Sequence, residues 1–280
     1  MFIYVMVNGL PGKIATEAAK AIAKDERMEL VKYSLTGEGI MEDKIYVEGV
    51  EITLIKPSER EKYRFIFEDA FQEMAEWKPF AIVDLTVPSA VNDNVKLYAS
   101  HGFNFVVGTT GGDQEEMELD IRRSSSIAVI APNMSIPIVI IQAMWKYAAK
   151  KFPGSLCEFS FEGWESHQKG KKDRSGTMRS FLPLFRQLGI DAGPENIDII
   201  REPEDQVAAG VPEEFLGAHG WHDYDLSSGA NQMNIYFGHN INGRATYTRG
   251  MIEAILFIYR KSLESTEKGR VYTMIDVISK

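Results

Sequence analysis

Short apolar runs alternate with amphipathic stretches through about the first 130 residues, and this alternation limits the possible fold more than any other feature. The run at 2–7 (FIYVMV) contains no charged residue, as expected of a strand that is covered on both faces. Residues 13–25 follow it, and there apolar residues recur at helical spacing. Because strands that alternate with helices form parallel sheets, the pattern predicts a Rossmann-like, doubly wound α/β domain.

The same alternation locates the other elements of this domain. Further strands are expected at 29–35, 50–55, 80–86, 103–107 and 127–133, and helices at 59–77, 89–102 and 114–126. Sheets of this kind bind ligands beyond the carboxyl ends of their strands. Four such ends carry glycine or polar residues: Gly9, Asp84–Thr86, Gly108–Gly112 and Pro132–Ser135.

After residue 134 the pattern becomes that of an α+β domain. Helices are expected at 136–152 and 178–190, a strand with one wet face at 156–168, and an antiparallel pair at 219–228 and 232–241. The amphipathic stretch 245–264 is a helix that can return to the first domain. We therefore expect two domains, formed by residues 1–133 with 246–280 returning, and by residues 134–245.

Composition excludes several functional classes. The net charge of −9 does not suit non-specific nucleic-acid binding. No apolar run approaches the ~20 residues of a membrane span, and the first seven residues lack the basic flank of a signal peptide. The single cysteine, Cys157, has no partner for an internal disulfide and is expected to be buried and without a role.

The turn after the first strand has the composition of a dinucleotide-binding loop. Gly9, Gly12 and Ala15 lie three residues apart, and Lys13 and Ile14 open the helix. Such a turn needs glycine so that the main chain can approach a pyrophosphate, which the helix N-terminus attracts. The spacing is not the usual G-x-G-x-x-G, and a merely structural turn is the alternative interpretation.

The end of the second strand bears on the choice of cofactor. An NAD site usually has an acidic residue there, but Ser34 and Thr36 occupy this end and the first acid is Glu38. The two hydroxyls can donate to a 2′-phosphate, and Lys13 or Lys44 can supply charge. NADPH is therefore favoured over NADH, although the polar residues can also simply end a strand.

The stretch 164–178 (WESHQKGKKDRSGTM) is either a solvated basic loop or a site for a small anion. Ser175 can cap the helix that follows, and Gly176 lets main-chain N–H groups reach a carboxylate. His167 lies eight residues earlier and can face the same anion. Glu165 and His167 lack a third metal ligand nearby in the sequence, so no metal is expected.

Six segments together resemble the 4-hydroxy-tetrahydrodipicolinate reductase (dihydrodipicolinate reductase) family. They are GLPGKIA, IVDLTVPSAV, VVGTTG, IAPNMSI, ESHQKGKKDRSGT and RVYTMIDV, in family order over nearly the whole chain. The bacterial loop usually has two adjacent histidines, where this chain has His167 and Gln168. Its Asp173-Arg174-Ser175-Gly176-Thr177 segment is one residue shorter and is similar to the plant type, as is KFPG at 151–154.

The resemblance implies NAD(P)H-dependent reduction of a cyclic imine dicarboxylate, with loss of water, in diaminopimelate and lysine biosynthesis. His167 would supply a proton, because an ordinary histidine pKa of about 6.5 suits delivery near neutrality. Lys171 would stabilise developing charge. The implied substrate-binding residues are Gln168, Ser175, Gly176, Thr177 and Arg244. The implied cofactor-binding residues are Gly9, Gly12, Lys13, Ile14, Ser34, Thr36, Asp84, Thr86, Gly108, Thr109, Thr110, Pro132, Asn133 and Met134.

The resemblance also implies a dinucleotide-binding first domain and a substrate-binding second domain whose sheet joins a homo-oligomer, either a dimer or a tetramer. Bacterial cytoplasm or plastid stroma is the expected compartment. Two other functions remain open: another two-domain amino-acid dehydrogenase, and a dinucleotide sensor without activity. Neither accounts for a His/Lys pair that precedes a Ser-Gly-Thr turn.

Several polar residues also have purely structural interpretations. Lys169 and Lys172 are expected to be solvated, and His219 and His222 to be ordinary sheet residues. His239 and Arg244 are expected to straddle a turn. For Asp84, the alternative to a cofactor-binding role is that it simply caps the helix that starts at Pro88.

Overall fold

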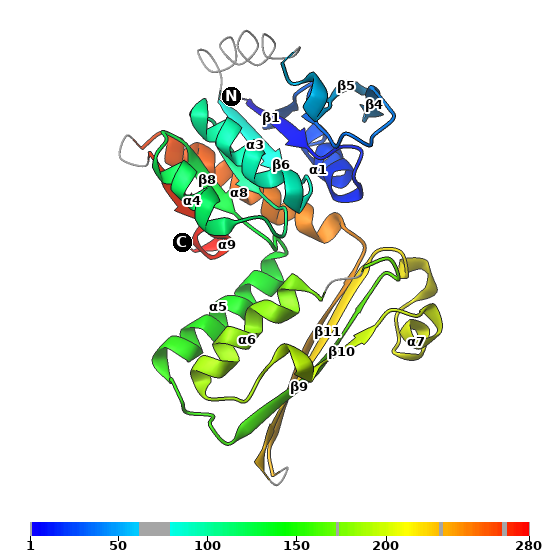
Figure 1. The fold of residues 1–280 in the computed structure, drawn as a ribbon, viewed down its shortest axis with the longest axis vertical. Helices are drawn as coiled ribbons and strands as arrows, with labels where there is room; N and C mark the ends of the chain where they lie inside the picture. Colours follow the sequence, from blue (N-terminus) through cyan, green and yellow to red (C-terminus); the bar gives the residue numbers. More distant parts are fainter. Residues whose placement is uncertain (1, 62–78, 172–173, 230–231, 265–267, 280) are drawn as a thin grey trace. The chain divides into compact units, whose positions relative to one another are not determined.

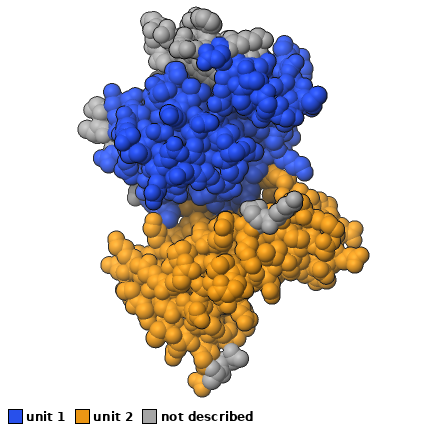
Figure 2. All heavy atoms as spheres, viewed as in Figure 1, with its two compact units in different colours: residues 1–136, 247–280 blue, residues 137–246 orange. Residues whose placement is uncertain are grey.

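The computed structural model describes residues 2–61, 79–171, 174–229, 232–264 and 268–279 (Figure 1). The chain forms two compact units, one made of residues 1–136 and 247–280 and the other of residues 137–246 (Figure 2). Most of the helix expected at 59–77 lies outside the described residues. Each unit has its own apolar core.

The first unit is built on a sheet of six parallel strands in the order β13-β8-β7-β6-β1-β2. Their bounds are β1 Ile3–Asn8, β2 Met28–Leu30, β6 Phe80–Asp84, β7 Asn104–Val107, β8 Ile127–Ile130 and β13 Arg270–Tyr272. Val5, Val83, Phe105 and Val129 are fully buried within it. The continuous apolar runs therefore form strands that are covered on both faces, and the predicted fold class is confirmed.

Helices cover the two faces of this sheet (Figure 1). They are α1 Lys13–Ala23, α3 Pro88–Ser100, α4 Gln114–Arg122 and α8 Thr248–Ser262. Helix α1 buries Ala15, Ala18, Ala19 and Ile22, whereas Ile14 in its first turn is 42% exposed. A short helix, α9 Met274–Ile278, ends the described chain.

The expected second strand at 29–35 is two strands in two different sheets. Its first part is β2, which pairs with β1, and its second part is β3 Tyr33–Leu35. Strand β3 runs parallel to β5 Val50–Ile55, which also pairs with β4 Lys44–Val47. The chain changes sheets at Lys32, whose carbonyl accepts from the Thr53 N–H while the Val31 N–H still donates to Val5.

The second unit has a four-stranded sheet in the order β10-β9-β11-β12. The strands are β9 Phe159–His167, β10 Ile197–Ile200, β11 His219–Ser228 and β12 Asn234–Asn242. Strand β10 is parallel to β9, and the other pairs are antiparallel. Helices α5 Ile136–Lys151 and α6 Gly176–Leu188 cover one face of the sheet, and α7 Pro203–Ala208 follows β10. Strand β10 and helix α7 were not expected from the sequence.

The helix-covered face of this sheet changes from apolar to polar along β9. Phe161 pairs with Leu226, and Gly163, two residues further along β9, pairs with Tyr224. Further along, Glu165 lies opposite His222. Because alternate residues of a strand share a face, the polar end of β9 carries its ionisable groups beside the end of the aromatic core.

Cys157 is exposed, so the expectation that it is buried is wrong. It lies in the turn that precedes β9, where the alternating burial of the strand has not yet begun. Among the described residues, no helix is long and apolar enough to span a membrane.

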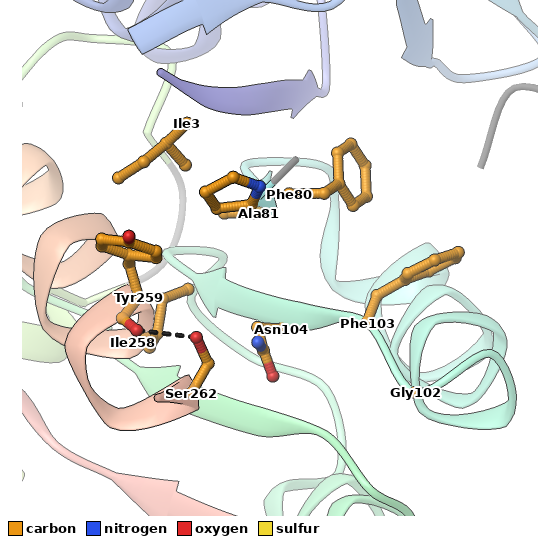
Figure 3. Close-up of a pocket in the computed structure, with 10 residues that line it drawn as sticks. Ile3, Phe80, Ala81, Gly102, Phe103, Asn104, Ile258, Tyr259 and Ser262 are labelled. Carbon is orange, nitrogen blue, oxygen red and sulfur yellow. Dashed lines mark hydrogen bonds between the residues drawn. The ribbon is translucent and has the colours of Figure 1, made fainter. Parts of the chain in front are cut away.

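A hollow of about 220 Å³ lies in the first unit, where residues of β1, β6, β7 and α8 meet (Figure 3). Its walls include Phe80, Phe103 and Tyr259. Phe80 and Asn104 begin their strands, so the hollow lies at the amino ends of β6 and β7. Ligands of parallel sheets bind at the carboxyl ends of the strands, so a dinucleotide is expected at the edge opposite this hollow.

Candidate active site

The turn between β1 and α1 holds the main chain close to a neighbouring strand. Gly9 has a φ of +102°, and a Cβ there would clash with the carbonyl oxygen of Leu85 just after β6. The Gly9 N–H donates to Leu35, and the Gly12 N–H donates back to Gly9, each at 2.8 Å. Only glycine fits the first position without strain.

Helix α1 begins without a side-chain cap. Its N-cap is Gly12, and within the described residues no acidic side chain lies in the first turn. Lys13 and Ile14 are exposed at this end. Uncapped N–H groups and the positive end of the helix dipole favour an anion, so the turn fits a dinucleotide pyrophosphate.

Asp84 lies at the end of β6, fully buried, at the centre of a hydrogen-bond network. Its carboxylate accepts from the Tyr98 hydroxyl at 2.7 Å and from Asn94 Nδ2 at 3.0 Å. It also accepts from the hydroxyls of Thr86 and Thr109, at 2.6 and 3.1 Å. Asp84 therefore acts through the two threonines, which it holds at the carboxyl edge of the sheet.

The interpretation of Asp84 as a helix cap is wrong, because the N-cap of α3 is Val87. The network extends instead to β1, where Asn8 Nδ2 donates to the Tyr98 hydroxyl at 2.7 Å. Burial and the nearby Asp84 charge raise the pKa of Tyr98 well above its usual value, so the phenol remains a donor. Asn8, Asn94 and Tyr98 were not identified from the sequence.

The loop after β7 packs closely on the segment after β8. A Cβ at Gly108 would clash with the Met134 methyl group and would lie 2.6 Å from Leu85 Cδ2. Met134 is 4% exposed, and the Asn133 side chain accepts from the Ser135 N–H at 2.9 Å. Thr110 and Pro132 are exposed on these two segments.

Ser34 and Thr36 do not offer their hydroxyls to a ligand, which corrects the role predicted for them. Both side chains are buried. The Ser34 hydroxyl donates to the Leu35 carbonyl at 3.3 Å, and the Thr36 hydroxyl donates to the Leu10 carbonyl at 2.5 Å. Because both hydroxyl hydrogens are already donated within the protein, they are not available to a 2′-phosphate. The Thr36 bond connects the end of β3 to the glycine turn.

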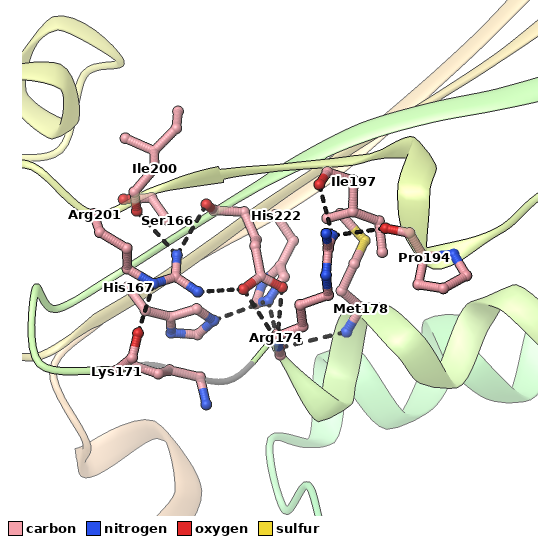
Figure 4. Close-up of polar contacts among 12 residues, drawn as sticks. Ser166, His167, Lys171, Arg174, Met178, Pro194, Ile197, Ile200, Arg201 and His222 are labelled. Carbon is pink, nitrogen blue, oxygen red and sulfur yellow. Dashed lines mark hydrogen bonds and ion pairs between the residues drawn. The ribbon is translucent and has the colours of Figure 1, made fainter.

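In the second unit, His167 ends β9, and each of its ring nitrogens lies near a polar atom; Figure 4 shows the contact with His222. Its Nδ1 lies 3.2 Å from the carbonyl oxygen of His219, and its Nε2 lies 3.3 Å from Nε2 of His222. A carbonyl can only accept, so the neutral imidazole carries its proton on Nδ1. Its Nε2 therefore has a lone pair that can receive a proton.

His222 is more than an ordinary sheet residue, which corrects its expected role. Its Nε2 lies 2.8 Å from the Ser175 hydroxyl oxygen, and its Nδ1 is buried with no partner among the described residues. An unpaired buried N–H is rarer than an unpaired acceptor, so we place the His222 proton on Nε2. The Ser175 hydroxyl then accepts from His222 and keeps its own hydrogen for an anion.

His239 lies within β12 rather than at a turn, and its ring stacks on that of His222 with centroids 4.6 Å apart. His219 has the structural role expected of it. Its Nε2 lies 2.7 Å from the Ser166 hydroxyl and its Nδ1 lies 3.1 Å from the Phe215 carbonyl.

The pKa of His167 is far from its ordinary value, which contradicts the sequence-based expectation. Burial, together with the positive charges of Arg201 and Lys171, lowers the pKa of His167 to about 3. The imidazole is therefore neutral at pH 7 in the unliganded protein. It cannot deliver a proton until a ligand changes its surroundings.

Glu165 and Arg201 form an ion pair beneath the loop that joins β9 to α6, with 2.5 Å between Arg201 NH2 and Glu165 Oε1. The Ser175 N–H donates to both oxygens of Glu165, at 3.0 and 2.8 Å. Ser175 was expected to hold a substrate carboxylate, but its N–H already donates to Glu165 and is not available for that contact. The Ser175 side chain caps α6 as expected, since it accepts from the Met178 N–H.

Gln168, Lys171, Gly176 and Thr177 lie on this loop or at the start of α6, whereas Arg244 follows β12. The Lys171 N–H donates to the Gln168 carbonyl at 2.9 Å, which closes a turn between them. Gly176 and Thr177 open α6. Arg244 is half-buried, and its NH2 lies 3.4 Å from the Gly217 carbonyl oxygen. Lys169 is 65% exposed and pairs with Glu202, whereas Lys172 lies outside the described residues.

The structure supplies the third potential metal ligand that the sequence lacked. Atoms of Glu165, His167 and His222 lie within 4.8 Å of one another. Two cations disfavour metal binding there. Arg201 already pairs with the Glu165 carboxylate, and the positive charge of Lys171 near His167 would repel a metal ion. The cluster is better suited to an anionic ligand.

These features define a class of protein. One unit is a doubly wound sheet whose glycine turn fits a dinucleotide, and the other presents a histidine, a lysine and a capped serine turn to an anion. These two features together are typical of a dinucleotide-dependent oxidoreductase that acts on a small acid.

Comparison with known proteins identifies the family. Residues 3–134 match the model described as "Dihydrodipicolinate reductase, N-terminus", and residues 137–278 match "Dihydrodipicolinate reductase, C-terminus". The chain belongs to the dihydrodipicolinate reductase family, so it is an NAD(P)H-dependent oxidoreductase. The resemblance inferred from the motifs is confirmed.

Similar proteins cover nearly the whole chain. Two chloroplastic 4-hydroxy-tetrahydrodipicolinate reductases of Arabidopsis thaliana are 37% identical over 277 residues, which is 99% of this chain and 78% and 77% of theirs. Their similarity fits the plant type of loop. A solved structure, dipicolinate-bound dihydrodipicolinate reductase from Paenisporosarcina sp. TG-14, covers 100% of both chains with a TM-score of 0.65 at 19% identity. That match supports the fold.

Proposed function

We propose that this protein reduces 4-hydroxy-tetrahydrodipicolinate to tetrahydrodipicolinate in diaminopimelate and lysine biosynthesis. The observation that carries the proposal is the clustering of His167, Lys171 and Ser175 in a chain that matches both halves of the family. The reaction consumes one hydride and one proton and releases water. Bound NAD(P)H supplies the hydride.

The chain's own residues bind the substrate and move the proton. The Ser175 hydroxyl donates to one substrate carboxylate, and the main-chain N–H groups of Gly176 and Thr177 support it at the start of α6. Lys171 stabilises negative charge that develops on the ring. Gln168 and Arg244 are proposed to contact the rest of the dicarboxylate.

The negative charge of the substrate can explain how His167, which is neutral in the free protein, becomes protonated. Burial, together with the charges of Arg201 and Lys171, holds the pKa of His167 near 3 in the free protein. Two carboxylates placed among these cations oppose their effect, and a nearby opposite charge favours the protonated imidazole. We therefore propose that the substrate raises the pKa of His167, which then takes up a proton at Nε2, turns this N–H from His222 Nε2 toward the substrate, and acts as the acid.

We propose NADPH as the preferred cofactor and NADH as a weaker one. Both oxygens of Glu38, the first acid after β3, accept hydrogen bonds from Ser58, at 2.5 and 3.0 Å. Lys13 is exposed at the start of α1 and can meet an additional phosphate. The proposed contacts of the cofactor are Gly9, Gly12, Lys13, Ile14, Thr86, Gly108, Thr109, Thr110, Pro132, Asn133 and Met134, with Asp84, Ser34 and Thr36 behind them.

Initial rates with enzymatically made hydroxytetrahydrodipicolinate test the function directly. The wild type should turn over with both cofactors and prefer NADPH. His167→Gln should lower kcat by about 100-fold or more with cofactor affinity nearly unchanged. Absence of turnover with either cofactor would refute the function, and a more than tenfold preference for NADH would refute the cofactor proposal.

The assembly and compartment of the protein stay predictions. A homo-oligomer should sediment well above the chain mass of 31.5 kDa, as a dimer or a tetramer. Trp221 and Tyr236, on the sheet face away from α6, are partly and largely exposed and are available for such pairing. Fractionation of the source organism would distinguish cytoplasm from plastid stroma.

A further inference from the structure

A buried ion pair underlies the loop that carries His167, Lys171 and Ser175. The Glu165 side chain is 0% exposed and the Arg201 side chain 13%. Glu165 lies in β9, and Arg201 directly follows β10, whose Ile200 is the parallel partner of Ser166. This strand pairing brings Arg201 beside the end of β9, although 36 residues separate it from Glu165.

Arg201 binds three parts of the main chain in addition to the Glu165 carboxylate. Its Nε donates to the Lys171 carbonyl at 3.1 Å. Its NH1 donates to the carbonyls of Glu165 and Ile200, at 3.3 and 3.0 Å (Figure 4). One guanidinium therefore fixes the middle of the loop to the ends of two strands.

Glu165 fixes the far end of the same loop. Both of its oxygens accept from the Ser175 N–H. The ion pair therefore joins Lys171, through Arg201, to Ser175, through Glu165. His167 lies two residues beyond Glu165 on the same face of β9.

The planar fork of arginine is what makes this arrangement possible. Its N–H groups point in fixed directions and can serve a carboxylate and several carbonyls at once, whereas a lysine ammonium on a flexible stem cannot reproduce the set. A buried ion pair is weak evidence for stability, because desolvation offsets much of the attraction. Its directional contacts with the loop indicate a positional role.

We propose that Arg201 is a positioning residue that acts with Glu165 to hold Lys171 and Ser175 in register with His167. This inference rests on the proposed function, because it concerns the same site. In the described part of the chain Arg201 bonds to Glu165, Lys171 and Ile200, and in this proposal it acts through the residues that it holds.

Arg201→Lys is the first test, with Arg186→Lys as the matched control. Arg186 also donates to a main-chain carbonyl, that of Ala192 at 3.0 Å, away from the loop. Arg201→Lys should lower kcat by about 100-fold, because misplacing reacting groups by ~1 Å has an effect of that size. The melting temperature should stay within a few degrees of the wild type, and Arg186→Lys should keep wild-type kcat.

Histidine titration followed by NMR supplies a readout that needs no turnover. Arg201→Met removes a positive charge beside His167, so the pKa of His167 in the free protein should rise from about 3. A purely structural arginine far from the imidazole would leave the titration unchanged. Glu165→Gln should also reduce kcat, because Ser175 and Arg201 lose a charged acceptor.

Wild-type kcat in Arg201→Lys would overturn the proposal. So would a loss of activity that only parallels the loss of folded protein, or an unchanged His167 titration in Arg201→Met. If the wild type fails to reduce the substrate while the titration shifts as expected, the proposed function is wrong and the placement of Arg201 beside His167 stands.

Discussion

At the scale of single residues, the proposed role of His167 as an acid would couple proton transfer to ligand binding. Its pKa is lowered to about 3 by burial and by two cations, and a dianionic ligand opposes both cations. The free protein therefore holds this acid in its unprotonated form. In this proposal, binding of the anion that is to be protonated is also the event that causes His167 to take up a proton.

Proton uptake on binding of dipicolinate is the first prediction. Calorimetry in buffers of different ionisation enthalpy should show uptake of a fraction of one proton at pH 6, and less at pH 8. The reason is that the complex raises the pKa of His167 while the free protein stays neutral there. His167→Gln should bind without uptake, and equal uptake in wild type and variant would contradict the mechanism.

Tyr98→Phe is the second prediction. The change removes a donor from Asp84 and an acceptor from Asn8, both fully buried, so it should lower the free energy of unfolding by about 1–3 kcal/mol. Chemical denaturation measures the loss. Tyr46→Phe is the matched control, because Tyr46 is 72% exposed and should change stability by less than about 0.5 kcal/mol.

Single residues also show what the sequence could and could not predict. His167, Lys171 and Ser175 were recognisable because they lie in one short segment. His222 and Arg201 were not, because strand pairing alone brings them beside that segment, 55 and 36 residues away from their partners. The lowered pKa of His167 depends on the same long-range contacts.

At the scale of elements, the glycine turn that opens α1 depends on two separate conditions. Gly9 has a positive φ, and it also lies against the Leu85 carbonyl. Gly49 shares only the first condition, since it has a φ of +82° and no atom within 4 Å of an added Cβ. The two positions therefore separate backbone strain from steric contact.

Gly9→Ala is the third prediction. It should weaken NADPH binding by at least tenfold, because the loop must move away from Leu85 to accept the new Cβ. A fluorescence titration measures the Kd. Gly49→Ala should lose about 1 kcal/mol of stability to strain and keep the wild-type Kd. Equal effects of the two changes on binding would show that close approach is not required.

Elements differed in how well the sequence predicted them. Apolar runs such as 80–84 and 127–130 form strands as expected, because a strand that is buried on both faces needs an apolar residue at nearly every position. The segment 29–35 looked like one strand, since its apolar residues do not reveal that the chain changes sheets at Lys32. Strand β10 is short and its pattern is mixed, so only its pairing with β9 defines it.

At the scale of the whole molecule, buried histidines should make the fold sensitive to acid. The pKa values of His167 and His239 are lowered, mainly by burial, to about 3 and about 4, and that of His222 is also lowered. Unfolded histidines have a pKa of about 6.5. Between these values the unfolded chain binds more protons, so stability falls as the pH falls from 6.5 toward 4.

His239→Phe is the fourth prediction and tests this dependence. Both ring nitrogens of His239 are buried and have no partner among the described residues, and the ring stacks near Tyr224 and His222. A phenyl ring can keep the stacking and cannot titrate. Denaturation curves from pH 7 to 5 should flatten by up to about 1.4 kcal/mol per pH unit. His101→Gln, at an exposed position, should leave the slope unchanged.

Strand β13 closes one edge of the parallel sheet with residues 270–272, although the first strand of that sheet ends at residue 8. On the ribosome, residues 137–246 emerge complete while the sheet of the first unit still lacks its last strand and helix α8. The inserted unit is therefore able to fold before the unit that surrounds it. Synthesis that stops a few dozen residues early leaves the edge of β8 uncovered, a state that chaperones must shield from aggregation.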